Sequence, residues 1–233
     1  MLLLLSCLLS YEVDKNQTLI GIEQTKAVRH INFDYGYKSS VKIEVIEGGM
    51  LTGHGSGNYF KIGKERFIIT AGHVITGGSA FFIRDKEEVV FLDLVYMDPH
   101  NDIAILVPYR KLESVKAVNY RINEKKDILG QSVNYTGYPS DLPKTLFTGT
   151  ISHSGIDHAI MQSFAIPGSS GSVVFDNGGR VIGVLSAVKV GMYELSPFPR
   201  LEENLVYIER LSRFSRKRTK EIVEKWRRLN ISP

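Results

Sequence analysis

The chain has 233 residues, enough for one large domain or two small ones, and its 43% hydrophobic and 23% charged residues exclude disordered, collagen-like and multi-span membrane classes. The single cysteine, Cys7, excludes a disulfide within the chain and any cysteine-ligated zinc or iron–sulfur site. The formal charge of +4 raises the hypothesis of a nucleic-acid partner.

Residues 1–10, MLLLLSCLLS, form a short apolar stretch. It is shorter than the roughly 20 residues that span a bilayer, and it lacks the basic start and small-residue cleavage site of a secretory signal. Three interpretations stand side by side: a weak export or anchor segment that associates the chain with a membrane, a start-site artefact, and a buried N-terminal strand. We assign residues 1–37 to an N-terminal extension, from which no localisation follows.

Short alternating or apolar runs, typical of β-strands, follow one another through residues 38–108. A hairpin is expected at 58–70, turning at Lys64-Glu65, because two such runs flank that pair. Gly, Asp, Asn or Pro bounds the later runs, as at strand ends. These residues are predicted to form the first of two β-rich units. Its runs are VKIEVI (41–46), NYFKIG and RFIIT (58–70), and AFFIR, VVFLDLVYM and DIAILVP (80–108).

Residues 109–127 are charged and lack such a pattern, so we interpret them as a connection to a second β-rich unit at 128–208. Within that unit, residues 176–179 (DNGG) predict a tight hairpin turn because Asn and Gly tolerate positive φ. Many short strands at this spacing indicate all-β barrels or sandwiches rather than βαβ units. The runs of the second unit are QSVNYTGYP, LFTGTISHS, AIMQSFA, GSVVFD and RVIGVLSAV.

The C-terminal segment, 209–233, accounts for the net positive charge of the chain. Residues 209–228 hold nine basic and three acidic side chains, so this stretch has a charge of +6 and the remainder of the chain −2. Apolar residues recur near helical spacing over 209–229, which predicts an amphipathic helix packed on the body with a solvated basic face. Binding of nucleic acid or an anionic surface through 209–228 is the less favoured alternative. The apolar residues are Leu211, Phe214, Ile222, Trp226 and Leu229.

Two segments of the first unit place a histidine and a carboxylate at strand ends. His73, in TAGHV, follows a strand-like run on a turn where its ring can face a cleft; a structural histidine is the alternative. Asp102 opens the apolar run of NDIAIL, where a buried carboxylate can fix the tautomer of an imidazole. A strand-capping Asp102 is the alternative. Asp98 competes with it, although Pro99 and His100 indicate a turn there.

The segment PGSSGS (167–172) is the most specific motif in the chain. A nucleophilic serine needs a tight turn that exposes its hydroxyl and aims backbone N–H groups at a developing oxyanion. The flanking glycines allow such a turn around Ser170, so that the N–H groups of Gly168 and Ser170 can converge. A Gly/Ser-rich surface loop is the alternative, but such loops seldom lead straight into a hairpin as apolar as the one that follows.

In the order His, Asp, Ser, these segments resemble the chymotrypsin-fold serine proteases, specifically the compact bacterial and viral branch with the HtrA/Deg-type protease domain and glutamyl-endopeptidase-like enzymes. The resemblance implies an all-β fold of two antiparallel β-barrels, with the catalytic groups in the cleft between them and an amphipathic C-terminal helix closing the back. The segments that carry it are GHGSGNYF (53–60), TAGHV (70–74), NDIAIL (101–106), YTGYP (135–139) and PGSSGSVVFDNGGRVIGVLS (167–186).

By this resemblance the chain is expected to be a serine endopeptidase that acts on protein or peptide substrates through an acyl-enzyme intermediate. Ser170 would be the nucleophile, His73 the general base and then acid, and Asp102 its orienting carboxylate. Gly168 and Ser170 would supply the N–H groups of the oxyanion hole. No cofactor is expected. The alternative function is a catalytically silent binding or assembly protein that uses its basic helix.

The same resemblance implies where a substrate binds. Phe164, six residues before the nucleophile, would lie near the floor of the S1 pocket, where its apolar ring offers no counter-charge for Lys or Arg. Ser186, Ala187 and Val188 would form the strand that pairs with substrate backbone, with Val188 narrowing the pocket mouth. These residues predict a preference for small or medium apolar P1 side chains.

The remaining histidines receive structural interpretations. His153 and His158, in HSGIDH, fit a hairpin with polar turn residues better than a metal site, so no metal ligand is assigned. His54, in GHGSG, is expected in a loop of the first barrel.

Overall fold

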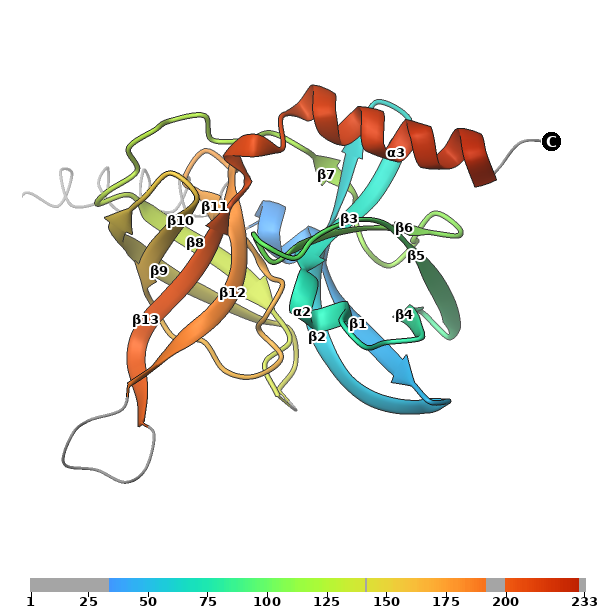
Figure 1. Ribbon diagram of the computed structural model, residues 1–233, viewed down its shortest axis with the longest axis horizontal. Coiled ribbons are helices and arrows are strands. Elements are labelled where there is room, and N and C mark those ends of the chain that lie inside the picture. The colour runs from blue at the N-terminus through green and yellow to red at the C-terminus, as the bar shows by residue number, and fades with distance from the viewer. Residues whose placement is uncertain (1–33, 141, 192–199, 231–233) are drawn as a thin grey trace, which may run out of the picture.

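The computed structural model describes residues 34–140, 142–191 and 200–230, without the side chains of 187–191 and 200–203. Two β-barrels lie side by side, and helix α3 (Arg216–Asn230) lies across one end of the first barrel (Figure 1). This arrangement confirms the predicted all-β double barrel with a C-terminal helix. The apolar stretch 1–10 lies outside the described residues. Within the described ranges, no helix is long and apolar enough to cross a membrane.

The first barrel closes because β1 pairs with both β2 and β4, so that the order β1-β4-β5-β6-β3-β2 returns to its start. Alternate residues of β1, Val41, Ile43 and Val45, point into a core that includes Tyr59. The expected hairpin forms between β2 and β3, with its turn at residues 63–64. The strands are β1 (Ser40–Glu47), β2 (Met50–Ile62), β3 (Glu65–Ala71), β4 (Ala80–Asp85), β5 (Glu88–Asp98) and β6 (Ile103–Pro108).

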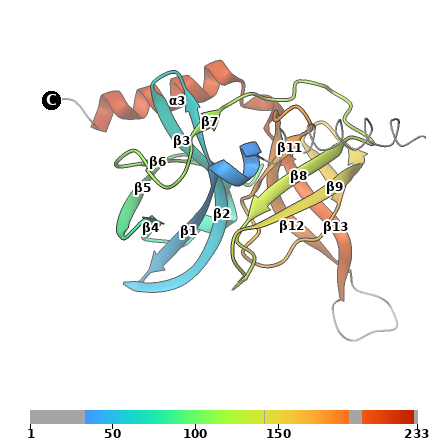
Figure 2. The same ribbon diagram turned by 180° about the vertical axis from the view of Figure 1, so that it is seen from behind.

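The connection at 109–127 contains β-pairing that the sequence did not indicate. Strand β7 (Val118–Asn119) pairs in parallel with the end of β2, and Ile122 forms a bridge to Val181 in the second barrel. Figure 2 shows this segment running from β6 past β7 to the second barrel. The connection therefore holds the two barrels together through backbone hydrogen bonds as well as linking them covalently.

The second barrel is closed in the order β10-β13-β12-β11-β8-β9. Its predicted tight turn is confirmed: Gly179 donates its N–H to the Asp176 carbonyl at 3.0 Å and adopts a φ of +68°. The turn sets the antiparallel pairing of β11 with β12. The strands are β8 (Ser132–Gly137), β9 (Thr145–Ser154), β10 (His158–Gln162), β11 (Val173–Asp176), β12 (Val181–Gly191) and β13 (Arg200–Arg210).

One hydrophobic cluster is shared by both barrels and the C-terminal segment. Phe60 of the first barrel lies 6.1 Å from Phe175 of the second, measured between ring centroids, and 5.3 Å from Tyr120 of the connection, edge to face. Phe214 and Val223 bring the C-terminal segment into the same cluster. The barrels therefore have a fixed relative position, which a site between them requires.

The prediction of a helix beginning at residue 209 is wrong. Residues 209–210 end β13, because that strand must pair with β10 and β12 to close the second barrel. Arg210 is only 5% exposed, and its guanidinium donates to three backbone carbonyls. The 3-10 turn η1 (Leu211–Arg213) follows, and the α-helix begins at Arg216. The three acceptors are the carbonyls of Lys125, Lys126 and Gly155.

Asp85 joins the β4–β5 hairpin of the first barrel to the connection. Its carboxylate is buried and accepts four hydrogen bonds, from Arg110, from the backbone of Glu113, and from the backbone and hydroxyl of Ser114. Burial by itself would raise the pKa of Asp85, but these donors outweigh it and lower the pKa to about 2. The ionised carboxylate therefore stabilises the folded state.

We predict that Asp85→Asn lowers the free energy of unfolding by about 2 kcal/mol at neutral pH, the equivalent of its pKa shift. Because the folded-state pKa lies below the unfolded value of 3.8, this stabilisation is complete above pH 3.8 and is lost as the pH falls toward 2. Denaturant unfolding at a series of pH values measures it. Glu87→Gln, on an exposed residue of the same hairpin, is the control; a difference between Asp85→Asn and the native protein that stays constant down to pH 2 contradicts the prediction.

Candidate active site

His73 and Asp102 lie together at the ends of two neighbouring strands. His73 is in the single helical turn α2 (Gly72–Ile75), which directly follows β3, and Asp102 directly precedes β6. The ring Nδ1 of His73 is 2.7 Å from Asp102 Oδ2, and the His73 backbone N–H donates to Asp102 Oδ1 at 2.7 Å. Both carboxylate oxygens thus face one residue, an arrangement that fixes the ring orientation and places the Nδ1 proton on the Asp102 side.

The backbone of Asp102 is bent to make this contact. Its φ is +48°, in the left-handed region that Asp tolerates better than most residues, and its carbonyl accepts the N–H of Gly72 at 2.9 Å. The Ser186 hydroxyl, from β12 of the second barrel, also donates to Asp102 Oδ2. Burial would raise the pKa of Asp102, but the hydrogen bonds from His73 and Ser186 hold it below its usual value, so the group is a carboxylate at neutral pH.

Asp98, the competing carboxylate, has a different role in the structure. It accepts the backbone N–H groups of His100 and Asn101 at 3.1 Å each, and the Asn101 side-chain amide at 2.8 Å. These are contacts within one turn, as the Pro99-His100 pair indicated. Asp102, rather than Asp98, is therefore the carboxylate that contacts His73.

The loop that carries Ser170 is a sequence of tight turns. Gly168 and Gly171 adopt φ values of +90° and +86°, which side chains rarely allow. Ser169 is fully buried and donates its N–H to the Ile166 carbonyl at 2.9 Å, while the Gly171 N–H bonds Leu185 of β12 at 2.8 Å. Ser170 lies between the buried Ser169 and Gly171 and is itself only half-buried, so the loop presents Ser170 at the surface of the second barrel.

Two backbone N–H groups of this loop are left free of hydrogen bonds to the described residues. The Pro167 carbonyl accepts the Ser140 N–H at 2.6 Å, so in the same trans peptide the Gly168 N–H points in the opposite direction. Within the described part of the chain, neither the Gly168 N–H nor the Ser170 N–H has a hydrogen-bond acceptor. Two such donors are available for an oxygen that develops negative charge.

Ser56 of β2, which the sequence analysis did not single out, holds this loop from the first barrel. Its buried hydroxyl donates to the Gly168 carbonyl at 2.7 Å and accepts the Tyr138 N–H at 2.8 Å. Its backbone N–H donates to the Ser170 carbonyl at 2.8 Å. Ser56 therefore fixes two peptides of the loop, Gly168–Ser169 and Ser170–Gly171. Only its place in the Gly-Ser-Gly run of residues 55–57 hinted at a close backbone approach.

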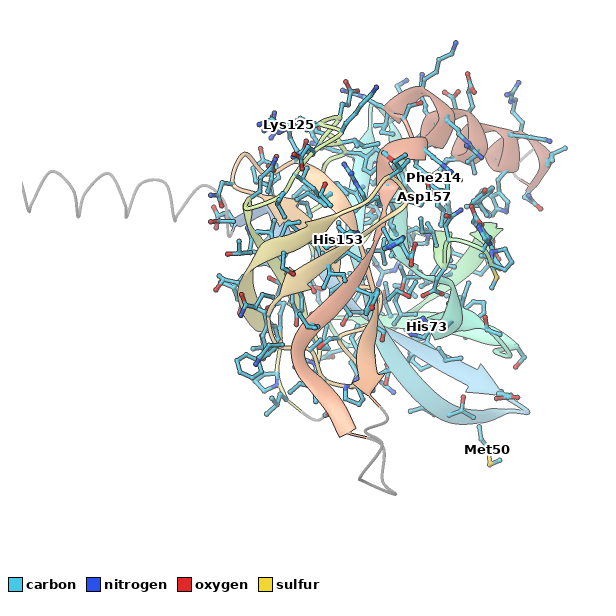
Figure 3. All side chains as sticks on the ribbon, turned by 60° about the vertical axis from the view of Figure 1, so that its left-hand side comes forward. Met50, His73, Lys125, His153, Asp157 and Phe214 are labelled. Carbon is cyan, nitrogen blue, oxygen red and sulfur yellow. The ribbon has the colours of Figure 1, made fainter. Side chains whose placement is uncertain are left out.

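The histidine and the serine approach each other across Gly55. A Cβ atom on Gly55 would lie 2.5 Å from the side chain of Val74, the neighbour of His73, and 3.2 Å from the Ser170 carbonyl. His73 is 47% exposed at this junction of the barrels (Figure 3), whereas His153 lies apart on the second barrel. In the described residues the His73 ring and the Ser170 hydroxyl are not hydrogen-bonded to each other. Such contacts are often long without substrate.

Of the residues expected to bind substrate, Ser186 has a contact at this junction. Phe164 is 63% exposed, and its carbonyl accepts a hydrogen bond from the Tyr135 hydroxyl. Its ring is therefore an open apolar surface, and its place at the floor of an S1 pocket stays a prediction. Ser186 contacts Asp102, while Ala187 and Val188 continue β12, their side chains lying outside the described residues.

The structure places the three histidines that were predicted to be structural, His54, His153 and His158, in strands. His54 lies in β2, paired with Glu44, and not in a loop as predicted, because β2 begins at Met50 and its pairing with β1 extends through the Gly-rich run. Its Nε2 lies 3.0 Å from the Tyr138 carbonyl. The rings of His153 and His158 stack with centroids 6.0 Å apart. No three His, Cys, Asp or Glu side chains gather as metal ligands in the part that the structure describes.

Comparison with known proteins identifies several similar chains. Residues 55–184 match the family model described as trypsin-like peptidase domain, a range that contains His73, Asp102 and Ser170. Protease Do-like 1, chloroplastic, of Arabidopsis thaliana is 32% identical over 151 residues, which cover 58% of this chain and 33% of that protein. A probable periplasmic serine endoprotease DegP-like of Brucella suis is 29% identical over 144 residues, covering 57% and 27%.

A solved structure has the same fold. The serine endoprotease from Yersinia pestis superimposes with a TM-score of 0.64 at 20% sequence identity, over 87% of this chain and 67% of that one. At this identity the likeness concerns the fold alone. The curated relatives are longer: the matched part spans about a third of their length.

We predict that Gly171→Ala destabilises the fold by about 3 kcal/mol or more, because its Cβ would lie 2.2 Å from both the Ser56 carbonyl and the Thr70 hydroxyl at a φ of +86°. Gly63→Ala is the control, since Gly63 also has positive φ but has nothing within 4 Å of the added atom; it should cost about 1 kcal/mol. Denaturant unfolding compares the two. Equal losses would mean that the close approach of the barrels is not what selects glycine at 171.

Proposed function

The chain belongs to the trypsin-like peptidase domain family, and from that premise we propose that it is a serine endopeptidase with Ser170, His73 and Asp102 as its catalytic residues. The observation that supports this most strongly is the double contact of Asp102 with the ring and the backbone of His73, at 2.7 Å each. The loop that carries Ser170 adds two N–H groups without an acceptor among the described residues. These are the parts that acyl transfer needs: a base with a fixed tautomer and a site for an oxyanion.

The proposed reaction has two halves. In the first, the Ser170 Oγ attacks the scissile carbonyl carbon while its proton passes to His73 Nε2; the C–N bond then breaks and the same proton moves to the leaving amine. In the second, water attacks the acyl-enzyme, gives a proton to His73, and the returning proton restores the Ser170 hydroxyl as the acid product leaves. Asp102 stays ionised throughout and stabilises the imidazolium.

The oxyanion of each tetrahedral intermediate would be stabilised by the N–H groups of Gly168 and Ser170. The Ser140 N–H bonds the Pro167 carbonyl and the Ser172 N–H bonds the Ser169 carbonyl. Because these are the carbonyls of the two peptides that carry the Gly168 and Ser170 N–H groups, the donors do not need to reorganise during the reaction. The substrate proposed is a protein or peptide whose backbone lies along β12 at residues 186–188. The open ring of Phe164 supports a preference for small or medium apolar P1 side chains.

Covalent labelling tests the nucleophile directly. A fluorophosphonate probe should label the native chain, and Ser170→Ala should abolish labelling, because the phosphorus–oxygen bond forms at the Ser170 Oγ. Ser152→Ala, which removes an exposed hydroxyl on β9, is the control and should label normally. Labelling that persists in Ser170→Ala would place the nucleophile at another residue, and a native chain that is never labelled would indicate a catalytically silent member of the family.

The position of Ser56 predicts a second kinetic effect. Ser56→Ala removes the donor to the Gly168 carbonyl and leaves the Tyr138 N–H without its acceptor. The Gly168–Ser169 peptide, which joins the two proposed oxyanion donors, then loses its support from the first barrel. We expect kcat for a peptide substrate to fall about a hundredfold, with KM changed by less than about threefold. Ser79→Ala is the control: it too removes a hydroxyl-to-carbonyl hydrogen bond from the first barrel, but at an exposed position. It should leave both kcat and KM unchanged. A rise in KM at constant kcat would instead indicate a role in substrate binding.

A further inference from the structure

A solvent-accessible cavity lies on the first barrel, formed by residues that the proposed reaction does not use. It is bounded by the ends of β2 and β3 and by the start of the connection, and its volume is about 540 Å³. A second cavity of about 290 Å³ adjoins it and shares Lys61, Lys116 and Ala117. Residues that line the larger cavity include Tyr59, Lys61, Arg66, Lys111, Leu112 and Lys116.

The larger cavity gathers cations that have no anionic partner. Lys61, Arg66, Lys111 and Lys116 form no ion pair with any residue that the structure describes, and Lys61 and Arg66 are half-buried. The one acidic residue in the lining, Glu113, is paired with Lys86 at 2.5 Å. Four positive charges at one cavity, in a body whose net charge is −2, repel one another unless an anion lies between them.

Two buried donors at the cavity lack acceptors. The Tyr59 hydroxyl is fully buried, and the Leu112 backbone N–H approaches its oxygen as a donor, so its own proton has no acceptor in the described ranges. The Arg66 Nε likewise has no acceptor there. Burial raises the pKa of Tyr59, so its hydroxyl keeps its proton and can donate. Buried donors are nearly always paired, and an unpaired one costs about 1–3 kcal/mol, so these two atoms point to a ligand that accepts hydrogen bonds.

We propose that this cavity binds a compact small-molecule polyanion of the oligophosphate class. A single carboxylate would leave three of the four cations unpaired, whereas linked phosphates bring three or more charges into a small volume. Lysine binds phosphate as a point charge, and the free Arg66 Nε and Tyr59 hydroxyl donate to its oxygens. A long polymer is disfavoured because the half-buried donors lie inside a bounded cavity rather than along an open surface.

Helix α3 is the competing basic surface, and its cations are partly neutralised. Arg227 pairs with Glu65 at 2.5 Å, Lys220 with Glu224 at 3.3 Å, and the Arg218 guanidinium lies 5.2 Å from the centre of the Phe214 ring. Lys217 and Lys225 on this helix form no ion pair among the described residues, and they provide a matched control with the same loss of charge.

Calorimetric titration of the full chain with sodium tripolyphosphate tests the proposal. Lys61→Gln/Lys116→Gln should weaken binding by about a hundredfold, and Tyr59→Phe, which keeps the ring in the core, by about fivefold. Lys217→Gln/Lys225→Gln should change the affinity by less than about twofold. Circular dichroism and thermal unfolding verify that each variant is folded before it is titrated.

The comparison ligands decide between chemical classes. Equal binding of adenosine triphosphate supports a nucleotide as the source of the phosphates, and weaker binding supports a free oligophosphate. Citrate bound as tightly as tripolyphosphate would overturn the assignment to phosphate. Equal weakening by the α3 variant, or no heat from tripolyphosphate at low salt, would overturn the cavity as the binding site. Tyr59→Phe with unchanged affinity would overturn the role of the buried hydroxyl.

Discussion

The contact between Ser56 and the loop at 167–172 is the interaction on which the candidate active site depends. The chain has one cysteine, so no disulfide within the chain can brace that loop. Instead, a single residue of the first barrel bonds the carbonyls of Gly168 and Ser170 in the second. Because the donors and acceptors belong to different barrels, these bonds to the loop form only when the barrels are docked.

The close approach of the two barrels restricts the size of the side chains at their junction. Gly55, Gly57 and Gly171 lie where a Cβ atom would approach the opposite barrel or the core more closely than 3 Å. The large aromatic cluster of Phe60, Tyr120 and Phe175 lies behind them and sets the separation of the barrels. The glycines and the aromatic cluster therefore have complementary roles. The glycines let the backbones of the two barrels come within hydrogen-bonding distance, and the buried aromatic rings stabilise the docked arrangement.

The features that could be predicted from the sequence are those that depend on residues close together in the chain. Strand runs, the turn at 176–179 and the residues Asp102 and His73 follow from short patterns and from the resemblance that they carry. The errors all involve partners distant in the sequence. Arg210 lies in a strand because it pairs with Gly183 of β12, and His54 lies in a strand because it pairs with Glu44 of β1. The part played by Ser56 depends on a contact across 112 residues, which no local pattern encodes.

Net charge along the sequence is likewise a poor guide to where an anion binds, because what matters is whether each cation already has a partner. The C-terminal stretch carries +6, yet Arg210 is buried against carbonyls, Arg213 pairs with Asp157 at 2.6 Å, and Arg227 pairs with Glu65. The nearly neutral body contains the opposite case, a cavity whose four cations form no ion pair with the residues that the structure describes. A partly buried cation without a partner gains more free energy from binding an anion than an exposed one does, because its desolvation has already occurred on folding. The anion site that we propose therefore lies in the nearly neutral body rather than in the most basic segment.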